Sequence, residues 1–310
     1  MAPEDHQVIL HQYDVSPYVR KVKIVLAIKR IDWRACTQPV IAPKPDLVAL
    51  TGGYRKIPVL QIGADIYCDS DLIIRELDRR YPDPPLHTGT DKAILFALSP
   101  WFAALLTETA VPLIFSDGRS VDPAFARDRD QVMGRPYVDI PGWKAAAPRA
   151  AEALRAQLDW IDRMLADRRS WLGGDTPGLL DAFAFPNIGF MRDMGIDIAL
   201  IDAFPRITAW EERVCNLGEG GRSEISTAEA VEIASRATPL TGGDVAPNEP
   251  NGLKAGDRVV VRAVDYGQDP VEGILISASA QHATIQRMDE RAGLISAHFP
   301  RFGFQIDRHA

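Results

Sequence analysis

The sequence predicts an α/β domain, an all-helical domain and a small β-domain, in that order along the chain. Apolar runs typical of strands alternate with helical patterns up to about residue 83. Between residues 91 and 236 the apolar residues recur at helical spacing throughout. A segment rich in Pro, Gly and Asn follows, and short strand-like runs come after it. We therefore expect domains at residues 1–83, 84–238 and 257–310, with a linker at residues 239–256.

The first domain combines strands and helices in a recognisable order. Ser16 and Pro17 mark the start of its first helix, because Ser is a preferred cap and Pro fits the first helical position. Strand–helix–strand, a connector and strand–strand–helix within about 80 residues is the order of a thioredoxin-like domain. The expected elements are strands at 8–10 and 33–40, a hairpin at 57–68, and helices that begin at Ser16 and Asp69.

The second domain is expected to be all helical. Asp122 and Pro123 cap and start one helix, and residues 145–169 form a long amphipathic one. Residues 179–191 are apolar almost all round, which is typical of a central buried helix. Ser226 and Glu229 form a capping box at the start of the last helix.

The last region reads as a small β-barrel or sandwich of about 55 residues. Its strand-like runs are separated by turn residues, and it carries no chemical motif that we identify. We therefore expect a chain that ends near Ala237 to fold without this region. The expected strands are residues 258–264, 273–277, 284–288 and 294–299.

Composition excludes several classes of function. The 310 residues carry a net charge of -7, which argues against a nucleic-acid-binding domain, usually basic. The polar N-terminus is unlike a signal peptide, and we expect no membrane-spanning run, so the cytoplasm is the expected location. The three cysteines are far apart, so neither a disulfide framework nor a metal site is indicated.

Three separated motifs in the first domain resemble those of the glutathione S-transferase superfamily. Residues 16–22, SPYVRKV, resemble the active-site turn of its serine- and cysteine-type classes, and residues 55–60, RKIPVL, resemble the segment before its cis-proline. Asp69 and Ser70, followed by an apolar helix, resemble the acidic-Ser pair of that family. The resemblance extends, more loosely, over residues 6–235.

This resemblance implies that glutathione binds as a co-substrate, with no metal. Ile57, before Pro58, would pair its backbone with the cysteinyl part of the tripeptide. Asp69 would accept the γ-glutamyl ammonium, and Ser70 with its helix N-terminus would hold the carboxylate. Lys44 matches a lysine that meets the glycyl carboxylate in some members.

Ser16 is the expected catalytic residue. A free thiol has a pKa of about 8.5, and lowering it by two units needs about 2.7 kcal/mol of anion stabilisation. One charge-assisted hydrogen bond contributes about 1.5–3 kcal/mol, so the hydroxyl together with the helix end can supply it. Tyr13 is the rival donor, since tyrosine-type classes use a Tyr at the end of the first strand, and Tyr18 is a further candidate.

The expected function is that of a glutathione S-transferase, or a glutathione peroxidase, acting on a small hydrophobic electrophile in detoxification. The alternative is a non-catalytic interaction module of the same fold; a glutaredoxin-type reductase is disfavoured because Ser16 replaces the cysteine and no CxxC is present. The resemblance also implies a homodimer, with no nucleic-acid or membrane partner. The expected electrophile contacts are Trp101, Phe102, Leu105, Phe115, Tyr137 and Trp143.

Overall fold

The first domain has the predicted thioredoxin-like architecture. The computed structural model describes residues 7–87, 91–116, 121–137, 139–196 and 199–309. Four strands of this domain lie in the order β4-β3-β1-β2, with β1 parallel to β2 and antiparallel to β3. The elements are β1 (Val8–Gln12), α1 (Pro17–Ile28), β2 (Asp32–Thr37), α2 (Pro45–Thr51), β3 (Val59–Ile62), β4 (Asp65–Cys68) and α3 (Ser70–Arg80).

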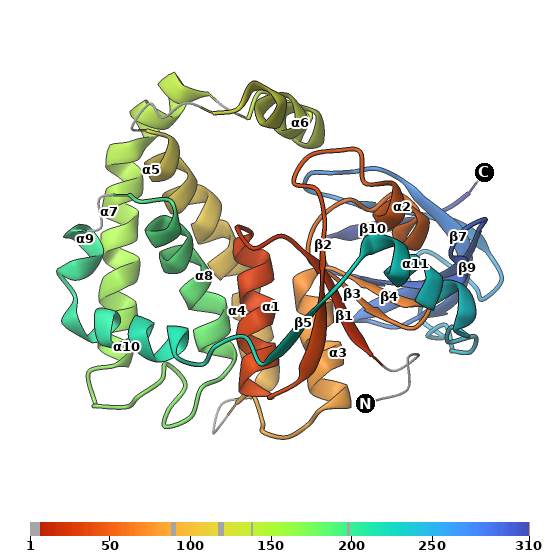
Figure 1. Cartoon of the computed structure of the whole chain (residues 1–310), viewed down its shortest axis with the longest axis horizontal. Helices are drawn as coiled ribbons and strands as arrows, with labels where there is room; N and C mark the ends of the chain where they lie inside the picture. The colour runs from red at the N-terminus through yellow and green to blue at the C-terminus, as the bar shows by residue number, and fades with distance from the viewer. Residues whose placement is uncertain (1–6, 88–90, 117–120, 138, 197–198, 310) are drawn as a thin grey trace.

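Successive side chains of β1 point to opposite faces of the sheet, and each face is covered by a different layer. Val8 and Leu10 belong to the main core, in which α1 packs against α3 and against the helical domain. Ile9 faces the other way and packs with Cys36 and residues of α11 (Thr227–Arg236). Helices α1 and α3 therefore lie between the sheet and the helical domain, while α2 and α11 cover the far face (Figure 1).

The second region is the predicted helical domain. Its central helix α8 is buried, and the carboxylate of Asp181 accepts hydrogen bonds from the backbone of Gly178 and Leu172 and from the Trp210 indole. The helices are α4 (Lys92–Leu105), the π-helical η2 (Leu106–Ala110), α5 (Val111–Phe115), α6 (Pro123–Met133), α7 (Ile140–Met164), α8 (Leu179–Asp193), α9 (Ala199–Asp202) and α10 (Pro205–Cys215).

One helical stretch departs from the expectation about membrane-length runs. Residues Lys92–Phe115 are long and apolar enough to span a membrane, by length and composition alone. The sequence expectation of no such run is therefore wrong here. In the structure this stretch packs against α7 and α8 in the helical bundle.

The chain leaves the helical domain earlier than the sequence predicts. Strand β5 (Gly221–Ile225) pairs in parallel with β2, and α11 then packs on the first domain. The sequence analysis places residues 221–236 in the helical region because the capping box at Ser226 is evident and β5, with only Ile225 buried, has no apolar alternation. These elements belong spatially to the thioredoxin-like sheet.

The C-terminal strands extend that sheet instead of forming a barrel of their own. They are β6 (Arg258–Ala263), β7 (Val271–Ala278), β8 (His282–Asp289), β9 (Gly293–Pro300) and β10 (Phe304–Arg308). The 10-stranded order is β10-β6-β7-β8-β9-β4-β3-β1-β2-β5, and no pairing of β9 with β10 closes it among the described residues. We call the strands β6 to β10 the appended sheet; it lies beside the first domain in Figure 1.

Polar side chains lock the appended sheet to β4. Strand β9 runs parallel to β4, and the buried His298 bonds through Nε2 to Asp65 at 2.9 Å and through Nδ1 to Thr284 at 2.9 Å. The Tyr67 ring stacks on His298 at 4.2 Å between centroids. The segment at 239–256 is also packed, since the backbone N–H of Leu240 donates to Asp65. It is therefore not a linker with few crossing contacts.

These contacts change the expected behaviour of a truncated chain. A chain ending at Ala237 exposes the edge of β4 and leaves the buried Asp65 without His298. We expect it to be insoluble, or to melt about 10 °C or more below the full chain, because 1 kcal/mol corresponds to about 2–4 °C at this size. Solubility and thermal melting of both chains test this, and equal melting temperatures would contradict it.

Candidate functional site

The Ser16 turn has the predicted geometry. Ser16 is extended in backbone conformation, and its Oγ accepts a hydrogen bond from the backbone N–H of Val19 at 3.3 Å. The helix that follows begins with Pro17, as expected. Because a hydroxyl has one donor and two acceptor positions, this bond leaves the Ser16 proton available to a further partner. Ser16 is buried, while Tyr18, two residues further on, lines a large cavity.

That cavity brings together the two other predicted motifs. It has a volume of about 650 Å³, and Ile57, Pro58, Asp69 and Ser70 line it. The Ile57–Pro58 peptide bond is cis. Asp69 caps α3 by accepting from the backbone N–H of Asp71 at 2.8 Å. Motifs that are more than ten residues apart in sequence therefore face one space at the start of α3.

Asp69 has an unusual conformation and an unusual acidity. Its φ of 82° lies in the region that residues other than glycine rarely adopt. Burial, with the neighbouring Asp71 carboxylate, raises the pKa of Asp69 to about 6. Strained residues are concentrated at functional sites, so both properties make Asp69 a candidate site residue.

The sequence does not predict that a buried lysine, Lys21, contacts Ser70. Lys21 is buried in α1, and its Nζ donates to Ser70 Oγ at 3.3 Å, to Ser99 Oγ at 2.8 Å and to the carboxylate of Asp71. Its charged head also lies 4.8 Å from the centre of the Phe183 ring. Lys21 thus neutralises Asp71 and orients the Ser70 hydroxyl. A lysine among other basic residues of a helix carries no sequence signal of this role.

Lys44 and Tyr13 lie close together, and neither is among the residues that line the 650 Å³ cavity. Lys44 Nζ is 5.2 Å from the Tyr13 ring centre and donates to the Arg55 carbonyl at 3.5 Å. Burial lowers the pKa of Lys44 to about 8, so it is partly neutral in mildly alkaline solution. Burial also raises the pKa of Tyr18 to about 12. The Tyr18 phenol is therefore an uncharged donor.

The appended sheet supplies part of the cavity wall. Seven residues of its strands and connecting loops line the space: Asp265, Tyr266, Gln281, Pro300, Phe302, Gly303 and Phe304. Lys56 from the RKIPVL motif lines it as well and pairs with Asp265. The sequence does not predict that these residues line the cavity, because only the pairing of β9 with β4 brings them there.

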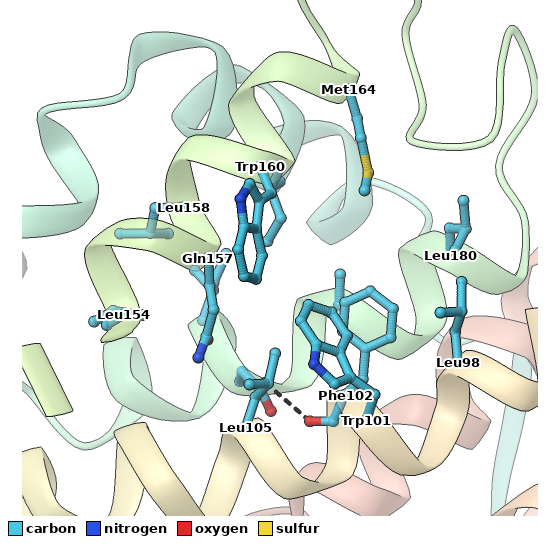
Figure 2. Close-up of a pocket in the computed structure, with 14 residues that line it drawn as sticks. Leu98, Trp101, Phe102, Leu105, Leu154, Gln157, Leu158, Trp160, Met164 and Leu180 are labelled. Carbon is cyan, nitrogen blue, oxygen red and sulfur yellow. Dashed lines mark hydrogen bonds between the residues drawn. The ribbon is translucent and has the colours of Figure 1, made fainter. Parts of the chain in front are cut away.

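The expected electrophile contacts divide between two places. Helix α4 presents Phe96, Pro100 and Ala103 to the 650 Å³ cavity, whereas Trp101, Phe102 and Leu105 line a different, apolar pocket of about 340 Å³ between α4, α7 and α8. Figure 2 shows Trp101 and Trp160 on facing sides of that pocket. These three residues therefore do not face the cavity that holds Asp69 and Ser70. Their helical spacing could not reveal which face of α4 turns toward that cavity.

The remaining aromatic candidates form one cluster. The rings of Phe115 and Tyr137 are 6.3 Å apart and those of Tyr137 and Trp143 are 6.2 Å apart, both edge to face.

Helix α6 carries this end of the helical domain toward the first domain (Figure 1). Its Asp128 accepts from the backbone N–H of Ala42 at 3.0 Å and pairs with Arg55.

Comparisons with known proteins agree with the fold. Residues 10–85 match the family model described as glutathione S-transferase, N-terminal domain, and residues 144–213 match the corresponding C-terminal domain. The crystal structure of a GST-like protein from Pseudomonas syringae is 35% identical, covers 97% of this chain and 100% of its own, and has a TM-score of 0.77. The appended sheet thus lies within the part shared with that protein.

Curated relatives match about two thirds of the chain. Glutathione S-transferase U2 of Arabidopsis thaliana is 23% identical over 71% of this chain and 87% of its own length. Maleylacetoacetate isomerase of Pseudomonas aeruginosa is 26% identical over 64% of this chain and 86% of its own. The chain belongs to the glutathione S-transferase superfamily.

The Lys21 network gives a test of the site's architecture. Replacing Lys21 with Met keeps most of the side-chain volume but leaves Asp71 and Ser70 without their cation. We expect a loss of about 2 kcal/mol in the free energy of unfolding, because Asp71, whose side chain is only 27% exposed, keeps its charge without the cation. Denaturant unfolding measures this. Ser99→Ala, which removes one neutral partner, is the control and should cost clearly less.

Proposed function

We propose that this chain is a glutathione-dependent transferase in which Ser16 stabilises the glutathione thiolate for attack on a small hydrophobic electrophile. The observation that carries the proposal is the convergence of Ile57, Pro58, Asp69 and Ser70 on one cavity. Asp69 and Ser70 would meet the γ-glutamyl end of the tripeptide, and the backbone of Ile57, before Pro58, would meet its cysteinyl unit. The family to which the chain belongs supports the same ligand.

The two ends of glutathione would be held by charge. Asp69 would receive the γ-glutamyl ammonium, and the Ser70 hydroxyl with the N-terminus of α3 would receive the adjacent carboxylate. Lys44 would meet the glycyl carboxylate. Between them, the backbone of Ile57 would pair with the cysteinyl unit as an added strand does.

Ser16 would then act on the sulfur. Its Oγ accepts from Val19, which leaves the hydroxyl proton free to donate to the sulfur, and the start of α1 would add its dipole. Tyr13 and Tyr18 remain rival donors. A donor that stabilises a thiolate serves addition, substitution and peroxide reduction alike, and also isomerisation by reversible addition to a conjugated double bond.

We also propose a cytoplasmic homodimer with a role in detoxification.

The reaction class can be tested directly. Purified protein would be assayed against a panel of aryl halides, conjugated carbonyl compounds and peroxides, each with and without glutathione. We expect a rate that depends on glutathione with at least one class. If glutathione binds but no class reacts, the catalytic part of the proposal fails.

Ser16→Ala should separate catalysis from binding. We expect glutathione affinity within a few-fold of the wild type and kcat/KM reduced by about tenfold or more, since removing a charge-assisted hydrogen bond costs about 1.5–3 kcal/mol. Calorimetry and steady-state kinetics provide the two measurements. Tyr13→Phe and Tyr18→Phe are the matched variants. A fully active Ser16→Ala together with an inactive tyrosine variant would transfer the role to that tyrosine.

Glutathione affinity should depend on the protonation of Asp69. Its pKa is raised to about 6, so the carboxylate that accepts the ammonium forms as pH rises through that value and is lost below it. We expect affinity to increase about tenfold between pH 5 and pH 7, following the fraction ionised. Calorimetry across this range should give a sloping profile for the wild type and a flat, weaker one for Asp69→Asn. A sloping profile in that variant would assign the titration to another group.

A further inference from the structure

One loop of the appended sheet contacts both the thioredoxin-like domain and the helical domain. The connection between β6 and β7, residues 264–270, places Asp265 2.5 Å from Lys56 Nζ, and Lys56 Nζ lies 4.1 Å from the centre of the Tyr266 ring. On the other side, the backbone N–H of Gly267 donates to the Val132 carbonyl of α6 at 2.8 Å. We call residues 264–270 the bridging loop.

The bridging loop brings Tyr266 to a central position in the site. Tyr266 lines the 650 Å³ cavity together with Tyr18, Ile57 and Ser70. Tyr18, two residues after Ser16, faces the same space, and so do Phe96 and Ala103 of α4. Tyr266 therefore lies where the proposed thiol end and the helical domain approach one another.

We propose that the bridging loop is a wall of the glutathione site: Asp265 and Tyr266 position Lys56 beside the bound peptide, and the Tyr266 ring contacts the peptide. This inference rests on the proposed function. Lys56 directly precedes Ile57, whose backbone is to pair with the ligand, so a fixed Lys56 places a cation beside the tripeptide. Its side chain is 13% exposed, whereas that of Asp265 is 54% exposed, as for a carboxylate at the rim of the site.

The physical advantage of this arrangement is preorganisation. A free lysine side chain has many rotamers, and ordering it on binding costs conformational entropy. The ion pair with Asp265 and the face of Tyr266 hold Lys56 before the ligand arrives. Replacing Asp265 with a neutral residue should therefore weaken glutathione binding only in a chain that contains Lys56.

The experiment compares variants of the full-length chain by calorimetry with reduced glutathione. Asp265→Asn should weaken binding about threefold, because partly exposed ion pairs contribute modestly. Asp269→Asn, the same change in the exposed part of the same loop, should leave affinity unchanged. Tyr266→Ala should weaken binding about tenfold, and Tyr266→Phe, which keeps the ring, should stay within about twofold. In a Lys56→Ala background, Asp265→Asn should have no further effect.

The outcomes separate this inference from the proposed function. If Asp265→Asn and Tyr266→Ala bind as the wild type does while Asp69→Ala is weakened, the proposed site stands and the role of the bridging loop is overturned. An equal effect of Asp265→Asn with and without Lys56 would also overturn it, even if Tyr266→Ala does not fold. If the wild-type chain binds no glutathione, both proposals fail together.

Discussion

The pairing of β4 with β9 is the constraint on which the rest of the structure depends. A strand at the edge of a thioredoxin-like sheet has unpaired backbone groups, and here β9 covers them in a parallel register. The buried His298 bonds to Asp65 at the beginning of β4, while Asp69 and Ser70 follow directly after its end. The strand that delivers the proposed γ-glutamyl contacts is thus fixed by a partner more than 200 residues away in the sequence.

The same partner sheet also holds the other elements of the site. Arg287 of β8 donates to the Ala49 carbonyl at 2.6 Å, near the end of α2, and Arg291 pairs with Asp46 at its start. A Cβ on Gly52 would lie 2.7 Å from Arg287 Nε, so that side chain would have to shift, and the positive φ of Gly52 favours glycine there. Helix α2 follows Lys44, and the appended sheet therefore supports α2, Lys56 and β4 at once.

How far the sequence predicts this molecule depends on whether the signal is local. The Ser16 cap, the α3 start at Ser70 and the buried helix α8 follow from neighbouring residues, and all three are confirmed. Strand β5 lacks apolar alternation, and β10 is too short and too polar to predict. The partners of Lys21 and the approach of Tyr266 depend on distant pairing, so no spacing in the sequence could reveal them.

The charges around α3 match a ligand that carries both signs. A γ-glutamyl group presents an ammonium and a carboxylate on one carbon, so a site of either sign alone would repel half of it. Lys21 compensates Asp71, which would otherwise place a second negative charge beside the incoming carboxylate. In the proposed site Asp69 is left as the acceptor for the ammonium, and the Ser70 hydroxyl and the helix N-terminus remain for the carboxylate. The pairing of Lys21 with Asp71 would thus leave Asp69 as the carboxylate that is available to the ligand.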